Sequence, residues 1–289
     1  MQRIVLIMLN KDNQILRGCF KYGLIMKKII LSLCSLAATS VLASETITIG
    51  ASSVPHAEML RFIQPTLAKQ GYVLKISEFS EYLTPNLAVV QGQLDANFFQ
   101  TKPYLLQYNK DHHANLVDLV DVHLEPMGAY TNSSEAKFAK SKKPTDLIKG
   151  SKIAVPNDAT NEGRALNILQ ANGIIKVQPG IDLPTKKNIT ANPYGVEIVE
   201  LDPSMLPRVF SSKQVDIVLM TTNLAMFSGL NPTKATLLEQ KSSPFVNLVA
   251  VRADEINLPK MKALAKALTS PEMKTFIQQK YHGAVVPAF

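Results

Sequence analysis

Strand-like apolar runs alternate with helix-like segments along most of this chain, and this alternation restricts the fold more than any other feature. The runs are TITIG, YVLKI, KIAVP, VEIVEL, VDIVLM and FVNLVAV, and segments such as residues 57–70 and 165–172 lie between them. Such alternation is typical of α/β layers with largely parallel sheets. The sequence contains no repeat and no long Gly/Ser linker between independent halves. It therefore predicts two lobes joined by short strand-like crossings.

Residues 153–166, IAVPNDATNEGRAL, place a strand, a polar turn and a helix start within fourteen positions. Either Asp158 or Thr160 is the expected helix N-cap, and Asn161 and Arg164 follow on the first turns. Free backbone N–H groups at a helix start favour an anion, and an arginine nearby adds a bidentate fork for a carboxylate. The segment therefore predicts a binding site for a small acid.

Residues 26–43 have the parts of a secretory signal: two lysines at the start, an apolar centre and small residues at the end. The apolar centre is too short to span a bilayer. We expect translation to start at Met26, residues 1–25 to be an upstream extension, and cleavage to follow Ala43. The mature protein would then be periplasmic.

The two cysteines, Cys19 and Cys34, both lie before the expected cleavage point, so the mature chain has no disulfide and no thiol chemistry. Bacterial lipoproteins are cut just before an acylated cysteine. Leu33 stands where that cut needs a small residue, which disfavours lipidation at Cys34. If Cys34 were acylated, the protein would be attached to the membrane.

The formal charge of +8 is concentrated in the leader. Residues 1–43 contain six of the 31 basic residues and one of the 23 acidic residues, which leaves 25 basic and 22 acidic residues, or +3, for residues 44–289. So small an excess argues against a nucleic-acid partner. The mature chain also has no coiled-coil heptads and no long apolar stripe, so a monomer is expected.

Seven segments occur in the order found in one protein family. They are ITIGAS (47–52), FSEYLTPNLAV (79–89), LDANFFQTKPYL (94–105), HLEPMGAYT (123–131), PNDATNEGRAL (156–166), LPR (206–208) and SPFVNLVAVR (243–252). Together they resemble the NlpA-type methionine-binding proteins that feed ABC importers. The resemblance covers essentially all of residues 46–289.

The resemblance implies a two-lobed periplasmic binding-protein fold, type II-like, with a mixed sheet and flanking helices in each lobe. The ligand would lie in the cleft between the lobes. The first lobe would comprise residues 46–129 plus 245–289, and the second residues 130–244. The implied function is capture of L- or D-methionine, or a close analogue, for a membrane permease powered by an ATPase.

The resemblance also implies ligand-binding residues on both lobes. Arg164 corresponds to the residue that binds the ligand carboxylate, whereas Asn161 either holds a polar ligand group or caps the helix. The first lobe supplies aromatic residues around the apolar side chain of the ligand: Tyr82, Phe99 and Tyr104, with Phe79 beside them. A thioether packs well against such rings.

Two positions depart from the family pattern. Thr101 stands where the family has a histidine, and Thr221 stands where it has an asparagine, with Asn223 as the nearest amide. A hydrogen bond to a charged group contributes about 1.5–3 kcal/mol, so these changes bear on which ligand is held. Another hydrophobic amino acid or a methionine-containing dipeptide remains an alternative.

Enzyme signatures are absent from the mature sequence: it has no GxSxG, HExxH or GxxxxGK[ST] motif. His112, His113 and His123 do not stand at a recognised ligand spacing, so we predict no metal, and a solvated loop before the strand that starts near Leu116. No cofactor is expected. A surface antigen and a sensory module with the same fold are the alternatives to a transport component.

Overall fold

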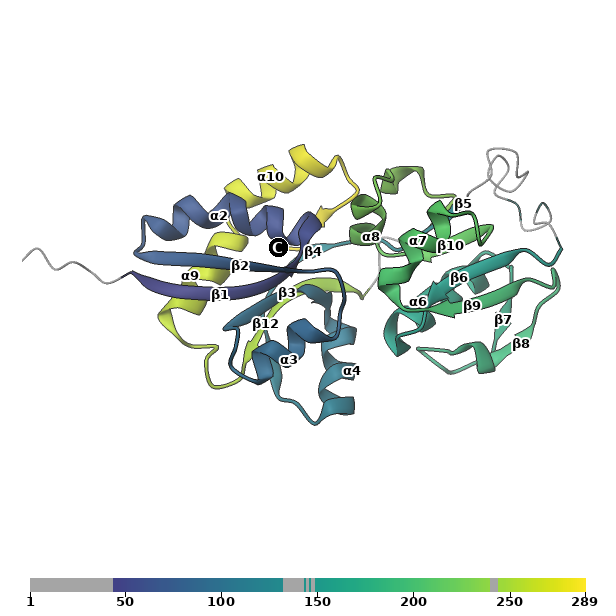
Figure 1. Ribbon diagram of the computed structural model, residues 1–289, viewed down its shortest axis with the longest axis horizontal. Helices are drawn as coiled ribbons and strands as arrows, with labels where there is room; N and C mark the ends of the chain where they lie inside the picture. The colour runs from purple at the N-terminus through teal and green to yellow at the C-terminus, as the bar shows by residue number, and fades with distance from the viewer. Residues whose placement is uncertain (1–43, 132–142, 144–145, 147–148, 240–243) are drawn as a thin grey trace, which may run out of the picture. The chain divides into compact units, whose positions relative to one another are not determined.

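Two β-sheets organise residues 44–289 (Figure 1). The structure is a computed structural model, and it describes residues 44–131, 143, 146, 149–239 and 244–289. The expected start at Met26, the signal peptide 26–43 and lipidation at Cys34 lie outside the described residues. Within the described part of the chain, none of the helices has the length and apolar character needed to cross a membrane.

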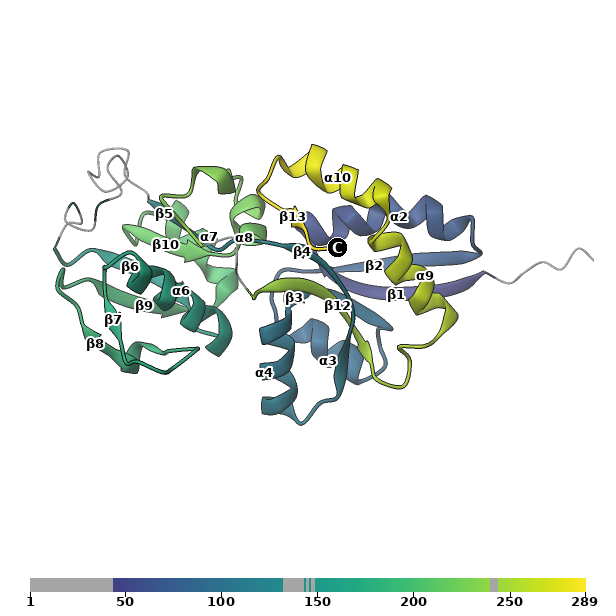
Figure 2. The ribbon, with the colours of Figure 1, turned by 180° about the vertical axis from the view of Figure 1, so that it is seen from behind.

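The first lobe is built on a six-stranded sheet of order β13-β4-β12-β3-β1-β2. The strands are β1 (Glu45–Ser52), β2 (Tyr72–Phe79), β3 (Ala96–Thr101), β4 (Leu116–Leu124), β12 (Val246–Arg252) and β13 (Val286–Pro287). One face is covered by α2 (Glu58–Ala68), α9 (Pro259–Leu268) and α10 (Pro271–Tyr281). The other face is covered by α3 (Thr84–Val90) and α4 (Lys102–His112), as Figures 1 and 2 show.

The second lobe is built on a five-stranded sheet of order β11-β5-β10-β6-β9. The strands are β5 (Gly128–Thr131), β6 (Lys152–Pro156), β9 (Glu197–Leu201), β10 (Ile217–Met220) and β11 (Leu237–Leu238). Helix α6 (Ala159–Ala171) packs on one face, whereas α7 (Leu206–Ser211) and α8 (Thr222–Phe227) pack on the other. A small ribbon of β7 (Lys176–Val177) and β8 (Ile189–Ala191) lies beside α6.

The sheets are mixed, so the family-based expectation holds and the simpler expectation of largely parallel sheets is wrong. The pairs β1–β2, β1–β3, β6–β9 and β6–β10 are parallel. Most antiparallel pairs involve the strands next to the crossings between the lobes: β12 with β3 and β4, β13 with β4, and β5 with β10 and β11. The small ribbon of β7 and β8 is antiparallel as well. A strand that returns from the other lobe runs against its neighbours because no helix reverses its direction first.

Side chains of strand β12 are buried on both faces of the first sheet. Val249 and Val251 belong to the core under α2, α9 and α10, whereas Leu248 and Ala250 pack under α3 and α4. All four are fully buried. A strand covered on both faces is a continuous apolar run rather than an alternating one, and NLVAV in this strand is such a run.

Helix starts in this chain follow local sequence signals. Five helices have proline within their first two positions, where a missing N–H costs nothing: α3, α4, α7, α9 and α10. Helix α6 starts after Asp158, whose side chain accepts a hydrogen bond from the backbone N–H of Asn161. Asp158, and not Thr160, is therefore the N-cap.

The chain passes between the two sheets twice. Residues 125–127 join β4 to β5. Residues 239–245 join β11 to β12, and the structure describes residues 239, 244 and 245 of this segment. Both passages contact Arg164 of α6, the first through the backbone carbonyl of Glu125 and the second through the carboxylate of Glu239. The crossings therefore contribute directly to the site described next.

Candidate functional site

A small cavity lies between side chains of the two lobes, and we call it the inner cavity. Its volume is about 20 Å³, which is room for about one water molecule. Eight of the nine residues predicted from the sequence line it: Tyr82, Phe99, Thr101, Tyr104, Asn161, Arg164, Thr221 and Asn223. Gln100, Glu125 and Asn247 complete the lining. Phe79 is the predicted residue that lies elsewhere.

Arg164 is buried in the wall of the inner cavity, with 2 % of its side chain exposed. Its Nε donates to Oε1 of Glu239 at 2.8 Å, and its Nη2 donates to Oε2 of Glu239 and to the backbone carbonyl of Glu125 at 2.6 Å. The guanidinium carbon lies 4.4 Å from the ring centre of Phe245. These contacts hold the guanidinium plane in place, and Nη1 is the nitrogen through which it can bind a further acceptor.

The helix start before Arg164 differs from the expected anion site in one respect. The N–H of Asn161 is not free, because it donates to Oδ1 of Asp158 at 2.9 Å. The amide Nδ2 of Asn161 also donates to both carboxylate oxygens of Asp158 at 3.1 Å. Asp158 therefore takes the place of an external anion at this helix end, and Arg164 is the group left to bind one. Burial raises the pKa of Asp158.

Three aromatic rings of the first lobe line the same cavity as this arginine. The ring centres of Tyr82, Phe99 and Tyr104 lie 5.8–6.2 Å apart, within the range in which aromatic rings attract each other. The hydroxyl of Tyr104 donates to the backbone carbonyl of Tyr82 at 3.3 Å. Burial raises the pKa of both tyrosines, so both stay neutral at physiological pH. The rings thus supply the aromatic part of the lining and Arg164 a charged part.

The hydroxyl of Tyr82 connects the two lobes through hydrogen bonds. It lies 3.1 Å from Oγ1 of Thr221, and it accepts from Nδ2 of Asn223 at 3.0 Å. Thr221 in turn donates to Oδ1 of Asn223. Thr221 thus binds the side-chain amide of Asn223 rather than taking the place of that amide. Both Thr221 and Asn223 contact the first lobe at Tyr82.

Thr101 has a buried hydroxyl with no hydrogen-bond partner among the described residues. Its side chain is 8 % exposed and lines the inner cavity. An unpaired buried hydroxyl costs about 1–3 kcal/mol, so such groups are rare in native proteins. Thr101 is therefore a polar position that a ligand atom can satisfy.

Glu125, which the sequence reasoning did not single out, is a buried carboxyl in the first crossing. Its Oε1 accepts from Nε2 of His123 at 2.7 Å and lies 3.4 Å from Nε2 of His56. Its Oε2 accepts from the N–H of Asn223 at 2.8 Å. Burial raises the pKa of Glu125 and lowers the pKa of His56 to about 4 and of His123 to about 3. Both histidines are therefore neutral near pH 7.

The same three side chains could be considered as metal ligands, since their ligand atoms lie within 4.8 Å of one another. Metal-bound histidines usually donate their second ring N–H to a nearby acceptor. Among the described residues, Nδ1 of His56 and Nδ1 of His123 have no such partner. We therefore interpret His123 as a group that positions Glu125 by hydrogen bonding, whereas the hydrogen-bond partner of His56 Nε2 is Oδ1 of Asn247 at 3.1 Å.

The structure separates the three histidines of the sequence analysis. His112 and His113 are exposed at the end of α4, before the strand that starts at Leu116, whereas His123 is fully buried in β4. Phe79 does not line the inner cavity. His123 and Glu125 both lie in the HLEPMGAYT segment, one of the segments that carry the family resemblance. That resemblance was therefore the sequence signal that could have identified these two residues as part of the site.

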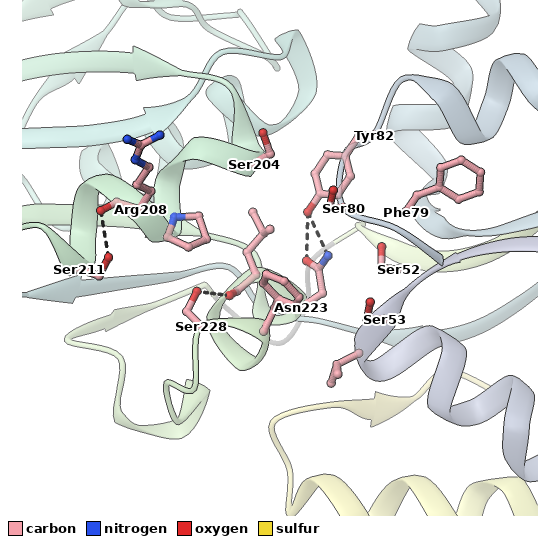
Figure 3. Close-up of a pocket in the computed structure, with 14 residues that line it drawn as sticks. Ser52, Ser53, Phe79, Ser80, Tyr82, Ser204, Arg208, Ser211, Asn223 and Ser228 are labelled. Carbon is pink, nitrogen blue, oxygen red and sulfur yellow. Dashed lines mark hydrogen bonds between the residues drawn. The ribbon is translucent and has the colours of Figure 1, made fainter. Parts of the chain in front are cut away.

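A second and larger cavity, the outer cavity, adjoins the inner one (Figure 3). Its volume is about 450 Å³, and Phe79 lines it together with Ser52, Ser80 and other residues. Tyr82 and Asn223 line both cavities. Figure 3 shows the hydrogen-bonded pair of Tyr82 and Asn223 at one side of the outer cavity. This pair therefore separates the two spaces.

Two α/β lobes joined by two crossings around an enclosed cavity are the architecture of a substrate-binding protein. The family follows from the sequence match: the NlpA lipoprotein family model matches residues 47–289, so the chain belongs to that family.

Relatives support this assignment along almost the whole length of the chain. The methionine-binding lipoprotein MetQ of Bacillus subtilis is 34% identical over 278 residues, which are 91% of this chain and 99% of the relative. The crystal structure of a nutrient-binding protein from Burkholderia cenocepacia bound to methionine is 39% identical, with a TM-score of 0.78, and covers 84% of this chain and 100% of its own. The structure of a periplasmic substrate-binding protein of an ABC transporter from Coxiella burnetii is 34% identical, with a TM-score of 0.76, and covers 84% of this chain and 100% of its own.

Proposed function

We propose that this protein captures methionine, or a close analogue, outside the cytoplasm and delivers it to the permease of an ABC importer. The observation that carries the proposal is that the buried guanidinium of Arg164 and three packed aromatic rings line one cavity. The names of the relatives support it: one is a methionine-binding lipoprotein, one holds methionine, and one is a component of an ABC transporter.

A zwitterionic amino acid has three features, and each finds a matching group in the inner cavity. Its carboxylate is bound at Nη1 of Arg164, since Nε and Nη2 already hold Glu239 and Glu125. Its ammonium donates to the carboxylate of Glu125, which has lone pairs beyond those used by His123 and Asn223. Its apolar side chain packs on the rings, where a thioether gains about 0.3–1.5 kcal/mol per contact.

Binding requires the lobes to separate first. A cavity of about 20 Å³ admits a single water molecule and no amino acid. Tyr82 must therefore move away from Thr221 and Asn223, which breaks the hydrogen bonds between the lobes. The ligand replaces these bonds with contacts to both lobes, and this difference in contacts favours a closed, loaded state that the permease can recognise.

The two departures from the family pattern concern the ligand side chain and head group. Thr101 presents a hydroxyl of small volume, which leaves more room at that point than an imidazole would. Thr221 is bonded to Asn223, so the amide rather than the hydroxyl is directed to the head group. Methionine remains the first ligand to test, in both L and D forms, with leucine as the competing hydrophobic amino acid.

Calorimetry of the purified protein with L-methionine, D-methionine and leucine tests the proposal. The Arg164→Lys variant keeps the charge, but one ammonium cannot hold Glu239 through two nitrogens and present a third nitrogen to the ligand. Methionine affinity should therefore fall at least tenfold, or about 1.4 kcal/mol. The matched control is Arg61→Lys on the surface of α2, where Arg61 is half exposed and pairs with Glu78. It should bind like the parent. If no tested amino acid binds the parent more tightly than about 1 mM, the proposed function is rejected.

A further inference from the structure

Glu125 is a buried carboxyl without a cationic partner. Its side chain is 3 % exposed. Among the residues that the structure describes, no lysine or arginine forms an ion pair with it, and its nearest basic groups are the rings of His56 and His123. Arg164 bonds to the backbone carbonyl of Glu125, and its charge is paired with Glu239. An unpaired buried charge is costly, so burial raises the pKa of Glu125 and favours its neutral form.

The two histidines do not supply the missing positive charge. Burial lowers the pKa of His56 to about 4 and that of His123 to about 3, so both rings are neutral between about pH 5 and 7. Nε2 of each ring lies against an oxygen, in Asn247 for His56 and in Glu125 for His123. In both rings Nδ1 has no hydrogen-bond partner among the described residues, so a second ring proton would stay unsatisfied. The geometry therefore keeps a further proton off the histidines and leaves Glu125 as the group that takes it.

The other titratable groups around Glu125 do not change charge in this pH range. Tyr82 of the first lobe and Tyr281 of α10 interact with it electrostatically, and burial raises the pKa of both hydroxyls, so both are neutral. Arg164 of α6 and Glu239 are paired with each other. The carboxyl of Glu125 is therefore the group beside the ligand ammonium whose charge can respond to the ligand.

A ligand ammonium reverses the balance at Glu125. In the proposed function the ammonium of the amino acid donates to this carboxylate, whereas the ligand carboxylate binds farther away at Arg164. The ammonium supplies the positive charge that the ligand-free site lacks. An opposite charge within about 4–6 Å favours the ionised form of a carboxyl. The loaded site therefore holds a carboxylate where the ligand-free site favours the neutral acid.

We propose that Glu125 holds a proton in the ligand-free protein and releases it when the ammonium of the amino acid binds, so that the buried site exchanges one cation for another. The O–H bond of the carboxyl breaks, its electron pair stays on the oxygen, and the proton passes to the solvent while the lobes are apart. This inference rests on the proposed function and adds a pH control to it.

The direction of the pH dependence follows from this exchange. Above the pKa of Glu125 in the ligand-free protein, the carboxyl is already ionised and no proton is released. Below that pKa each ligand must displace a proton, so the affinity falls by up to about tenfold per pH unit. Methionine is therefore held tightly at neutral pH and more weakly in acid.

Calorimetry counts the protons that leave. L-methionine is titrated into the parent protein at about pH 5, 6 and 7, where neither of its charged groups titrates. Each pH is measured in two buffers with different heats of ionisation, because a released proton adds the heat of the buffer that takes it up. Circular dichroism confirms that the protein is folded at each pH. We expect release of at least about 0.3 proton per ligand at pH 5, and an affinity at least about threefold weaker at pH 5 than at pH 7.

Two comparisons locate the proton. 4-(Methylthio)butanoate has the carboxylate and the thioether of methionine but no ammonium, so its binding should release no proton. Glu125→Gln keeps the shape of the side chain and cannot titrate, so it should bind methionine equally at pH 5 and pH 7 and release no proton. The matched control is Glu78→Gln, which removes a surface carboxylate of β2 that pairs with Arg61 and should release protons like the parent. If Glu125→Gln fails to fold, the two ligands on the parent decide.

The outcomes separate this inference from the proposed function. If methionine binds the parent equally at pH 5 and pH 7 without releasing a proton, the exchange is wrong and the proposed function stands. The exchange is equally wrong if 4-(methylthio)butanoate releases as many protons as methionine. It is also wrong if Glu125→Gln still releases a proton, which would point to Asp158, the other carboxyl of the inner cavity whose pKa burial raises. If methionine does not bind the parent at any of these pH values, both proposals are rejected.

Discussion

The pair formed by Arg164 and Glu239 gives the strongest quantitative prediction. Two parallel hydrogen bonds join the side chains, and their exposed fractions are 2 % and 11 %. Removing one partner of a buried ion pair typically costs 3–5 kcal/mol, because the other charge is left buried without compensation. Replacing both partners with apolar residues often costs far less. Arg164→Met and Glu239→Met should therefore each destabilise the ligand-free protein by about 3–5 kcal/mol.

The double variant Arg164→Met/Glu239→Met should lose only about 1–2 kcal/mol, so that the two changes are coupled by several kcal/mol. Urea denaturation of the four proteins without ligand measures this cycle directly. In a thermal scan, each single variant should melt about 10 °C lower than the parent, since 1 kcal/mol corresponds to about 2–4 °C at this size. Additive losses, with a coupling below about 0.5 kcal/mol, would refute the reasoning.

Two further predictions concern stability. First, the pKa of His56 is lowered to about 4 and that of His123 to about 3, chiefly by burial, whereas an unfolded histidine titrates near 6.5. As the pH falls below about 6.5, the unfolded chain takes up protons that the folded chain does not, and the free energy of unfolding falls by about 1.4 kcal/mol per pH unit for each histidine. Burial raises the pKa of Glu125, so the folded chain takes up a proton at this carboxyl more readily than the unfolded chain does. This offsets part of the fall in the free energy of unfolding. The melting temperature of the parent should therefore be lower at pH 5 than at pH 7, and this difference should be smaller in His123→Gln. Equal melting temperatures of the parent at the two pH values would contradict the reasoning. Second, Gly163→Ala would place a Cβ 2.6 Å from the Cα of Leu183, so the backbone must shift, and urea denaturation should show a loss of about 1–3 kcal/mol. An Ala variant as stable as the parent would show that this contact is loose.

Several local features could be predicted because their causes lie within a few residues of sequence. The alternation of apolar runs and helical stretches led to α/β lobes. The PNDATNEGR segment contains its own N-cap, since Asp158 bonds to an N–H three residues later. The position of Arg164 on α6 follows from that start. Family similarity then added the mixed sheets, which periodicity alone did not give.

The remaining features depend on pairings between distant parts of the chain. Arg164 meets Glu239 across 75 positions, and Tyr82 meets Thr221 across 139. No periodicity or spacing rule connects such residues, because their proximity depends on how the crossings bring the lobes together. The same packing buries His123 and places Phe79 in the lining of the outer cavity. Local sequence signals were thus enough to predict the α/β lobes and the helix that presents Arg164. Which charges neutralise that arginine, and where the free space lies, could be seen only in the folded chain, because both depend on burial and on contacts between the two lobes.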